Sequence, residues 1–549
     1  MAKIIEGLDL LNNDDIKKKL KQHIDKNHLI GFPTETVYGL GGNSLNEDSL
    51  KNIFKMKNRP VSDPIISHVC DISQAFEQLY HVNIFEKYII YILNKKFWPG
   101  PLSIIAKAKK NVPLILTAHT KFCAVRLPNN LIAREIIKIC ETPIAAPSAN
   151  KFQHISPTTS LHVFEEFKNE NILIFDDGQC DVGIESTVIK ITKFKKKKNV
   201  NSEKIHKNID NEINDIQEKN ILCNTISDDL NFKKNDEHDH NYSEDEITTD
   251  DEYDNEYKEE LKVLCQLTNS NNSDSNKEMY MKLKSIFENI ESDKKIPDYI
   301  LQQILKYKRL YNYKIIIYRR GKYTKNDIEE VLKSNKLLEN IEVDLYKKIK
   351  FEDLDIFQKE SKSQNNPNFK IIDKNNDIKN ENTNNQRHTN FLQKTEDTNL
   401  EKNEVSPGLL ITHYSPFVST YLIDIILKIE NYNVNNNLSN IQLNKCIFLD
   451  IGNSFIDYQN NFLKYINIYY DNLPKEEQIK YVTKNFFLFL RKAETLAINN
   501  KAENILISVV NLKLCDEIYL SIFDRIFRSA SGKILKAYIN NDKFQIFNN

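Results

Sequence analysis

The first 193 residues show the clearest alternation of short apolar and polar runs in this chain. Residues 28–32 are partly apolar and predict a strand, which Pro33 ends. A polar, glycine-rich loop follows, and from Asn46, which can cap a helix, apolar side chains recur at helical spacing. A strand, a glycine-rich loop and a helix in this order favour an anion site built from backbone N–H groups.

Two cations, Lys57 and Arg59, stand at the far end of this predicted helix and are close enough in sequence to return to the same cleft. Taken alone, the loop and these cations also fit a surface turn with two solvated side chains. The apolar pattern therefore suggests an anion site without proving one.

The last part of the chain, residues 417–549, has a second α/β pattern. Strands are predicted at 445–449 and 504–507, and helices at 486–498 and 518–529. The order is Rossmann-like, yet the dinucleotide motif GxGxxG does not occur in it. We interpret this part as a smaller α/β domain with a regulatory or lid-supporting role.

Glycine usage changes the picture between these two parts. Of the 12 glycines, eight lie in residues 1–183 and none lies between 184 and 320. A folded segment of that size would usually need glycine for its turns. We therefore predict that 194–295, which is rich in Asn, Asp and Lys, is disordered, with local helices possible at 279–290 and 296–310.

A second polar segment, 351–404, has the same composition and receives the same prediction. The net charge of −1 gives no reason to expect strong non-specific binding to nucleic acid. The eight cysteines form no CxxC pair, which argues against a zinc site and a disulfide framework. No apolar stretch reaches membrane-spanning length and no presequence is evident, so a cytoplasmic location without membrane attachment is expected.

A series of motifs in the first 190 residues identifies a family. In order, they are PTETVYGLG at 33–41, KNRP at 57–60, DPIISH at 63–68, FWPGPLS at 97–103, AVRLP at 124–128, APSAN at 146–150, SPTT at 156–159 and GIESTVI at 183–189. This series resembles the threonylcarbamoyl-AMP synthase family. The resemblance implies a YrdC-type fold, which is a twisted mixed sheet with helices and an open concave cleft.

The resemblance also implies how the chain is divided. The family joins the strand after ESTVV to the next strand by a short connection, and here that next strand is predicted at 314–318, followed by a helix at 325–332 that Thr324 can cap. The catalytic domain is therefore expected to comprise 1–193 and 296–350, with the first insertion inside it. The second insertion, 351–404, precedes a linker at 405–416 and the C-terminal domain at 417–549.

The linker and the last helix resemble the long, two-domain form of the family. The linker reads Ser406-Pro407-Gly408 and then His413-Tyr414-Ser415-Pro416, as in the family's SPG…HYAP pattern. Residues 518–530 resemble its GLGLAxxDRLxRAA helix, although both leading glycines are lost.

The family reaction condenses L-threonine, bicarbonate and ATP to threonylcarbamoyl-AMP and pyrophosphate. A carbamate and a triphosphate must be held within reacting distance, so the site needs fixed cations more than a strong base. Lys57 and Arg59 are the expected catalytic phosphate ligands. Mg²⁺ is expected with ATP, without metal ligands from the protein.

The remaining site residues are carried over from the matching motif positions. Arg126 is expected to bind the threonine carboxylate, and Tyr414 to fold over the cleft and exclude water. The threonine site is expected to contain Thr36, His68, Arg126, Ala146 and Ser186. The ATP site is expected to contain Lys57, Arg59, Asp63, Ser148, Asn150, Ser156, Arg319 and Tyr414.

Each of these residues also has a purely structural interpretation. His68 could be a satisfied histidine at a strand end, Ser148 and Ser156 could cap helices, and Arg126 and Lys57 could be solvated. Some positions also depart from the family: Asn58 and Asp63 replace glycine and asparagine, Arg320 replaces proline, and Phe152-Gln153 replaces the usual Ser-Gly pair. An extra carboxylate at Asp63 would repel a triphosphate unless Mg²⁺ lay between them.

Two other functions use the same fold. A hydrogenase-maturation carbamoyltransferase would add zinc fingers, for which the CxxC pairs are missing. A non-catalytic RNA-binding module, for double-stranded RNA for example, would need a basic, aromatic-lined groove, whereas residues 1–193 are close to neutral. The resemblance implies instead that tRNA is reached only indirectly, because the family's product passes to a separate KEOPS-type transferase.

Overall fold

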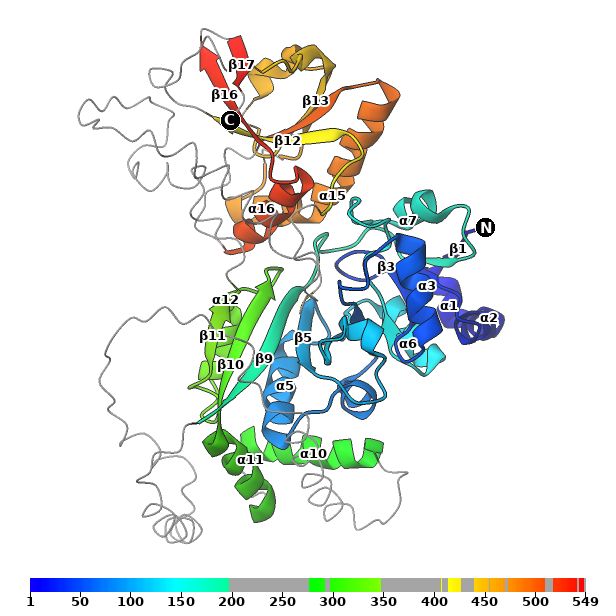
Figure 1. Cartoon of the computed structure of the whole chain (residues 1–549), viewed down its shortest axis with the longest axis vertical. Coiled ribbons are helices and arrows are strands. Elements are labelled where there is room, and N and C mark those ends of the chain that lie inside the picture. The colour runs from blue at the N-terminus through cyan, green and yellow to red at the C-terminus, as the bar shows by residue number, and fades with distance from the viewer. Residues whose placement is uncertain are drawn as a thin grey trace, which may run out of the picture.

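The computed structural model describes residues 1–196, 276–291, 297–346, 406, 413–425, 439–453, 455–469, 472–508, 517–540 and 543–547. These residues form two α/β domains (Figure 1). Most of the predicted disorder, at 197–275 and 351–404, lies outside the described residues, as does most of the linker. The α/β fold class predicted from the sequence is confirmed for both domains.

The first domain is built on an 11-stranded sheet in the order β1-β8-β2-β3-β7-β4-β6-β5-β9-β10-β11. Its strands are β1 (Lys3–Glu6), β2 (Ile30–Phe32), β3 (Gly39–Asn43), β4 (Ile66–His68), β5 (Leu102–Lys107), β6 (Phe122–Arg126), β7 (Ile144–Ala145), β8 (Leu173–Asp176), β9 (Thr187–Lys195), β10 (Tyr311–Arg319) and β11 (Glu342–Leu345). Both parallel and antiparallel pairs occur along it, so the sheet is mixed, as expected.

The helices of this domain are α1 (Gly7–Asn12), α2 (Asp14–Asp25), α3 (Glu47–Lys57), α4 (Ile72–Gln74), α5 (Ile84–Phe97), α6 (Leu131–Cys140), α7 (Ser160–Phe167), α10 (Asn276–Glu291), α11 (Asp298–Leu310) and α12 (Lys325–Lys333). Two predicted caps are confirmed. The Asn46 side chain accepts hydrogen bonds from two N–H groups at the start of α3, and Thr324 forms a capping box with Asp327 at α12.

The segment after the first insertion belongs to the same sheet. Strand β10 pairs antiparallel with β9, with Tyr311 opposite Lys195, and parallel with β11. The two strands that flank the insertion are therefore direct neighbours, and the excursion between them begins and ends at one edge of the domain.

The end of the first insertion forms the local helices that the sequence allowed at 279–290 and 296–310. Residues 276–291 form α10, which packs against α5. The Phe287 ring lies 5.3 Å from that of Tyr88 and 5.2 Å from that of Tyr91, and Leu283 and Ile286 are buried with it. The average composition of this segment is polar, so its apolar stripe is not evident from composition alone. Helix α5 is apolar on almost every face, and α10 covers one of these faces.

The C-terminal domain has a six-stranded sheet in the order β14-β13-β15-β12-β16-β17. Its elements are β12 (Ser419–Ile425), β13 (Cys446–Asp450), β14 (Lys464–Asn467), α15 (Lys475–Asn499), β15 (Asn504–Ser508), α16 (Glu517–Ser529), β16 (Ile534–Asn540) and β17 (Lys543–Phe547). The pairs are parallel except for β16 with β17. This is Rossmann-like, but β12 lies between β15 and β16, whereas the usual dinucleotide-binding order places the first strand beside the second.

One helix boundary differs from the prediction. Helix α15 begins at Lys475, eleven positions before the predicted start at 486, because its charged first turns conceal the apolar repeat. Pro474 precedes its first residue, a position where proline is well tolerated.

The two domains meet in a shared apolar cluster. Val37, Ile155 and Ile184 of the first domain pack with Tyr414 of the linker and with residues of α15 and α16, including Phe487. Figure 1 shows α15 and α16 on the side of the C-terminal sheet that faces the first domain. The cluster brings the C-terminal domain close to the motif-bearing loops of the first domain.

Candidate functional site

Helix α3 carries the two predicted phosphate ligands to its C-terminal end. Its C-cap residue, Asn58, has a φ of 55°, a left-handed conformation that asparagine tolerates better than most side chains. Asn58 can therefore stand where the family has glycine without a change of turn.

Lys57 does not line the cavity described below; it supports the loop that does. Its side chain is buried, and Nζ donates hydrogen bonds to the backbone oxygens of Ser148, at 2.5 Å, and Asn150. Burial, followed by repulsion from Arg59, lowers the pKa of the ammonium well below its ordinary value. The two hydrogen bonds leave one of its three N–H groups for a ligand.

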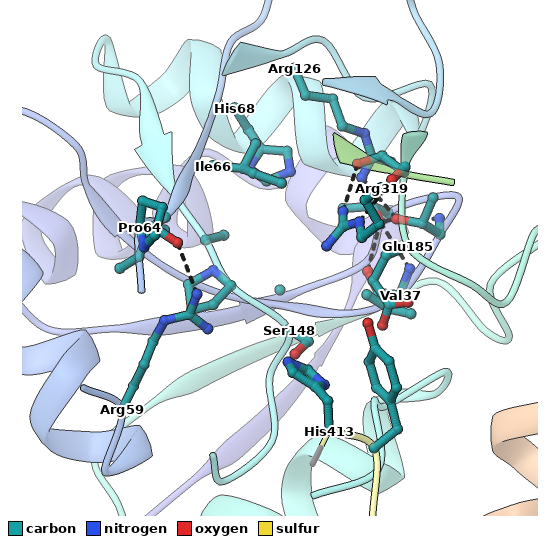
Figure 2. Close-up of a pocket in the computed structure, with 18 residues that line it drawn as sticks. Val37, Arg59, Pro64, Ile66, His68, Arg126, Ser148, Glu185, Arg319 and His413 are labelled. Atoms are coloured by element: carbon teal, nitrogen blue, oxygen red, sulfur yellow. Dashed lines mark hydrogen bonds between the residues drawn. The ribbon is translucent and has the colours of Figure 1, made fainter. Parts of the chain in front are cut away.

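Arg59 lines the cavity and is held from one side only. Nη2 donates to Pro64 O at 2.8 Å (Figure 2). The same nitrogen lies 2.8 Å from the Asp63 carboxylate, and Nε donates to Asp63 O at 3.1 Å. Asp63 is thus the ion-pair partner of Arg59 and does not line the cavity. Because the negative charge of Asp63 is compensated by Arg59, the repulsion between Asp63 and a triphosphate that the sequence suggested is reduced.

Arg126, at the end of β6, is gripped by two neighbours from the PTETVYGLG loop. Nη1 donates to Thr36 Oγ1 at 2.8 Å, and Nη2 lies 2.7 Å from Glu35 Oε1. The other oxygen of Glu35 accepts from the Asn129 N–H at 3.1 Å. Both charged side chains are buried, so the guanidinium is fixed in one orientation at the cavity wall.

His68 lies beside Arg126 because β4 and β6 are parallel and pair these two residues. Burial, followed by the charge of Arg126, lowers the pKa of the imidazole to about 3, so His68 is neutral at physiological pH. Among the described residues, His68 Nδ1 and Arg126 Nε have no hydrogen-bond partner. Buried polar atoms that face a cavity without partners are typical of a ligand site.

Ser186 and Arg319 form another wall. The Arg319 guanidinium donates to Ser186 O at 3.0 Å and to Ser186 Oγ at 3.1 Å, and Ser186 Oγ lies 2.8 Å from Ser103 Oγ. Arg319 ends β10, at a point where the register with β9 shifts. The replacement of proline by Arg320 therefore does not displace Arg319 from the cavity.

Asn150 and Ser156 are buried beside the cavity and do not line it. The Asn150 amide donates to Lys151 O at 2.7 Å and to His154 O at 2.8 Å, which shapes the loop that carries Ser148. The Ser156 hydroxyl donates to Glu185 Oε1 at 2.7 Å. Both residues act on the cavity through neighbours.

The linker closes one side of the cavity through His413 and Tyr414. Tyr414 is buried and has a φ of 62°, an uncommon conformation for a bulky residue, and its ring lies 5.1 Å from that of Phe487 in α15. Burial, followed by the nearby Glu185 charge, raises the pKa of the phenol. Burial, followed by the charge of Arg59, lowers the pKa of His413 well below its ordinary value.

Together these residues surround a cavity that is partly open to solvent, with an empty volume of about 580 Å³ that includes the solvent at its mouth. Figure 2 shows Arg59 on one side of it and Arg126 and Arg319 on the other. Its lining residues are Thr34, Thr36, Val37, Gly39, Arg59, Pro64, Ile65, Ile66, His68, Arg126, Ala146, Pro147, Ser148, Glu185, Ser186, Arg319, His413 and Tyr414.

Nine of the thirteen residues expected in the site line this cavity, and Lys57, Asp63, Asn150 and Ser156 lie behind its wall. Sequence reasoning did not single out Glu35, Glu185 or His413. Glu35 and Glu185 lie within quoted motifs, and each is a carboxylate beside a position expected to bind substrate. The sequence could have indicated both residues in this way, because an arginine buried in the site usually requires a carboxylate partner nearby.

No helix among the described residues has the length and apolar character needed to cross a membrane. In the same residues, no group of three or more His, Cys, Asp or Glu side chains could hold a metal ion.

Comparison with known proteins places these features in a class. Residues 22–200 match the Sua5, YciO and YrdC family model, described as "Telomere recombination", and residues 371–531 match "Threonylcarbamoyl-AMP synthase, C-terminal domain". The fold is also similar to that of the crystal structure of Pyrococcus abyssi Sua5 complexed with L-threonine, with a TM-score of 0.50, 18% identity and 98% of both chains covered. The chain is thus a two-domain α/β protein of the YrdC class.

Curated relatives narrow this class to a family. The chain is 42% identical over 174 residues to the threonylcarbamoyl-AMP synthase of Pyrococcus abyssi, which covers 31% of this chain and 49% of that protein. It is 33% identical over 193 residues to the putative threonylcarbamoyl-AMP synthase of Methanocaldococcus jannaschii, covering 34% and 87%. The chain belongs to the threonylcarbamoyl-AMP synthase family. The matched region spans about half the length of several of these relatives, including 51% of that from Bacillus subtilis.

Proposed function

We propose that this protein is an L-threonylcarbamoyladenylate synthase, a nucleotidyltransferase that condenses L-threonine, bicarbonate and ATP to threonylcarbamoyl-AMP and pyrophosphate. The threonine amine and bicarbonate first give a carbamate and water. A carbamate oxygen then bonds to the α-phosphorus of ATP as the bond from that phosphorus to the bridging oxygen breaks, and pyrophosphate leaves.

One observation carries the proposal: three buried guanidinium groups, from Arg59, Arg126 and Arg319, line a single cavity. Arg59 and Arg126 each pair with one carboxylate, whereas Arg319 donates to neutral oxygens of Ser186. All three guanidinium groups still line the cavity, where their charge and planar donors suit an anionic ligand. A pair of anionic substrates, a carboxylate with its carbamate and a triphosphate, matches such a site in charge.

On the threonine side, Arg126 would bind the carboxylate, because Glu35 and Thr36 already hold its guanidinium in place. Neutral His68 and the Ser186 hydroxyl would meet the amine and hydroxyl of the substrate. Ala146 would supply a small apolar wall. The preformed contacts reduce the reorganisation needed when the carbamate forms.

On the nucleotide side, Arg59 and Arg319 would bind phosphate oxygens, and the third N–H group of Lys57 would reach the same anion. The loop that carries Ser148 would be kept in position by Lys57 and Asn150. Tyr414 and His413 would cover the site and keep water from the mixed anhydride.

We propose that Mg²⁺ enters as part of the MgATP substrate, where it neutralises phosphate charge. The product would serve a separate transferase, of the KEOPS type, that modifies an adenosine of tRNA. Any contact of this chain with tRNA would then be indirect.

The test is threonine-dependent release of pyrophosphate from ATP in bicarbonate buffer, with mass-spectrometric detection of threonylcarbamoyl-AMP. We expect release to require all three substrates. Binding of RNA without pyrophosphate release would instead favour the non-catalytic alternative.

A further inference from the structure

We propose that Arg525, in α16 of the C-terminal domain, is a positioning residue for the nucleotide side of the catalytic cavity. The inference rests on the function proposed above and adds to it a role for the second domain. Arg525 is fully buried, and its side chain reaches out of its own domain.

Arg525 grips two separate segments of the catalytic domain. Nε lies 3.2 Å from Glu185 Oε2, and Nη1 donates to the backbone oxygen of Arg320 at 2.7 Å. Each segment has a cavity-lining residue next to the contact, Ser186 after Glu185 and Arg319 before Arg320. Arg319 in turn donates to Ser186, so the two segments are tied both directly and through Arg525.

The guanidinium group of Arg525 is also held by its own helix, α16. Nη1 also donates to Ser521 O at 3.0 Å and to Ser521 Oγ at 3.3 Å, one helical turn earlier. The guanidinium therefore acts as a rigid fork between the helix and the cavity wall, a geometry that lysine cannot reproduce.

Glu185 links this fork to the predicted ATP site. One of its carboxylate oxygens pairs with Arg525 and the other accepts the Ser156 hydroxyl at 2.7 Å. Loss of Arg525 would leave a buried carboxylate without its cation, in contact with the cavity. We expect Glu185, Ser156 and Arg319 to shift together as a result.

A glycine in the catalytic domain allows the segment before Glu185 to lie close to helix α15. Gly183, two residues before Glu185, has a φ of +77°, and a Cβ placed there would lie 2.2 Å from the backbone oxygen of Lys484 in α15. Only glycine fits there without moving the helix. The chain at 183–186 is therefore held by the backbone of α15 as well as by Arg525.

The contacts that hold Arg126, the expected ligand of the threonine carboxylate, do not involve Arg525, although Ser186 of the expected threonine site directly follows Glu185. Arg126 is held by Glu35 and Thr36, which lie in the same domain as Arg126 itself. Loss of Arg525 is therefore expected to affect ATP more than threonine.

The experiment measures KM for ATP, KM for threonine and kcat in the full chain carrying Arg525→Gln or Arg525→Lys. We expect Arg525→Gln to raise KM for ATP about 10-fold or more and lower kcat, with KM for threonine within about threefold of wild type. Arg525→Lys keeps the charge without the fork, so an intermediate result is expected.

Arg491→Gln is the matched control. Arg491, in α15, is also a buried arginine that crosses the domain interface, where Nη2 lies 2.8 Å from Glu166 Oε1 and donates to Ile155 O at 2.5 Å. None of these three residues lines the cavity, although Ile155 precedes Ser156 of the expected ATP site. If both glutamine variants raise KM for ATP equally, Arg525 only holds the domains together and the proposal is wrong.

Two further measurements keep the outcome decisive. Glu185→Gln and the double variant with Arg525→Gln should be non-additive in kcat/KM for ATP, because the residues form one pair. If Arg525→Gln does not fold, as judged by thermal melting, wild-type kinetics in Arg525→Lys overturn the proposal. A wild-type chain that releases no pyrophosphate would contradict the proposed function, whereas an active wild type with unaffected Arg525 variants would contradict only this inference.

Discussion

The two domains of this protein share an α/β architecture, but their residues answer to different requirements. In the first domain, short loops at strand ends must place charged groups around one cavity, so residue identity matters at each position. In the second domain, α15 and α16 contribute apolar faces to the cluster shared with the first domain, and a few polar contacts across the interface. The matches to the curated relatives cover about a third of this chain.

Helix α16 shows how loosely the second domain is constrained. The glycines that lead the corresponding family helix are absent here, yet Ile522, Phe523 and Ile526 are fully buried. Apolar periodicity is enough to seat such a helix, whereas an ion pair requires a particular residue. The same helix retains Arg525, the residue that touches the catalytic domain. A helix that departs from the family's sequence can therefore still keep the one residue, Arg525, whose contact requires a particular side chain.

The largest effect should come from within the first domain, at the end of its insertion. Replacing residues 200–270 with a short Gly/Ser loop should leave the melt and the activity unchanged, because β9, α10, α11 and β10 remain. Extending the deletion to 290 removes Phe287 and its contacts with α5, which should cost about 3–5 kcal/mol or more of unfolding free energy.

Thermal melts of the two deletions, measured side by side, check this expectation. If the two deletions are equally stable, α10 adds nothing to the core. The whole of 194–295 would then lie outside the folded catalytic domain, as its composition suggests.

Arg59→Ala should come next, through loss of catalysis together with a loss of stability, because Asp63 is left buried without its cation. Removal of this buried cation should cost roughly 2–4 kcal/mol of transition-state stabilisation, measured as kcat/KM for ATP. Lys55→Ala is the control, since Lys55 is an exposed lysine on the same helix. A rate for Arg59→Ala within about threefold of wild type would contradict the assignment of Arg59 as a phosphate ligand.

Substrate choice provides a smaller effect that belongs to the first domain alone. Serine should react less well than threonine by about 1–2 kcal/mol, about 5- to 30-fold in kcat/KM, because it lacks the methyl group that apolar residues such as Ile66 can contact. Arg525→Gln should not alter this ratio. Equal turnover of both amino acids would contradict the assignment of the Arg126 side of the cavity.

The smallest effect should be a pH dependence at the domain interface, at His154. Its two ring nitrogens contact Glu166 of α7 and, at 3.0 Å, Glu494 of α15. Burial alone lowers its pKa, but hydrogen bonds to the two carboxylates outweigh burial, so the pKa is raised above its ordinary value. The stabilising charge is therefore fully present below about pH 6.5 and is lost as the pH rises through the raised pKa.

Melting curves at several pH values should show this loss in wild type and a weaker dependence in His154→Gln. The difference between the two proteins should be about 1 kcal/mol, or about 2–4 °C, at acidic pH. An unchanged pH dependence in His154→Gln would show that the two domains do not rely on this contact.

Much of the fold follows from local sequence signals. Asn46 and Thr324 cap the helices that their positions predict, and the strands near 314 and 446 lie within one to three residues of their predicted bounds. These elements depend on caps, apolar runs and turn residues, which are local properties. The sequence allows a local helix at 279–290, but its packing against α5 and the early start of α15 could not be predicted, because polar residues dilute the apolar faces of both helices and the partner surface is distant in sequence.

The sequence by itself determined the motifs, and with them the family and the set of charged residues that the cavity needs. Only the tertiary structure decided which of those residues face the cavity: Arg59, Arg126 and Arg319 line it, whereas Lys57 and Asp63 stand behind as supports. It also brought Arg525 to Glu185 across 340 positions of sequence. The physical reason is that a cap or an apolar repeat is written in neighbouring residues, while the partner of a buried charge is chosen by packing between segments that are distant in the chain.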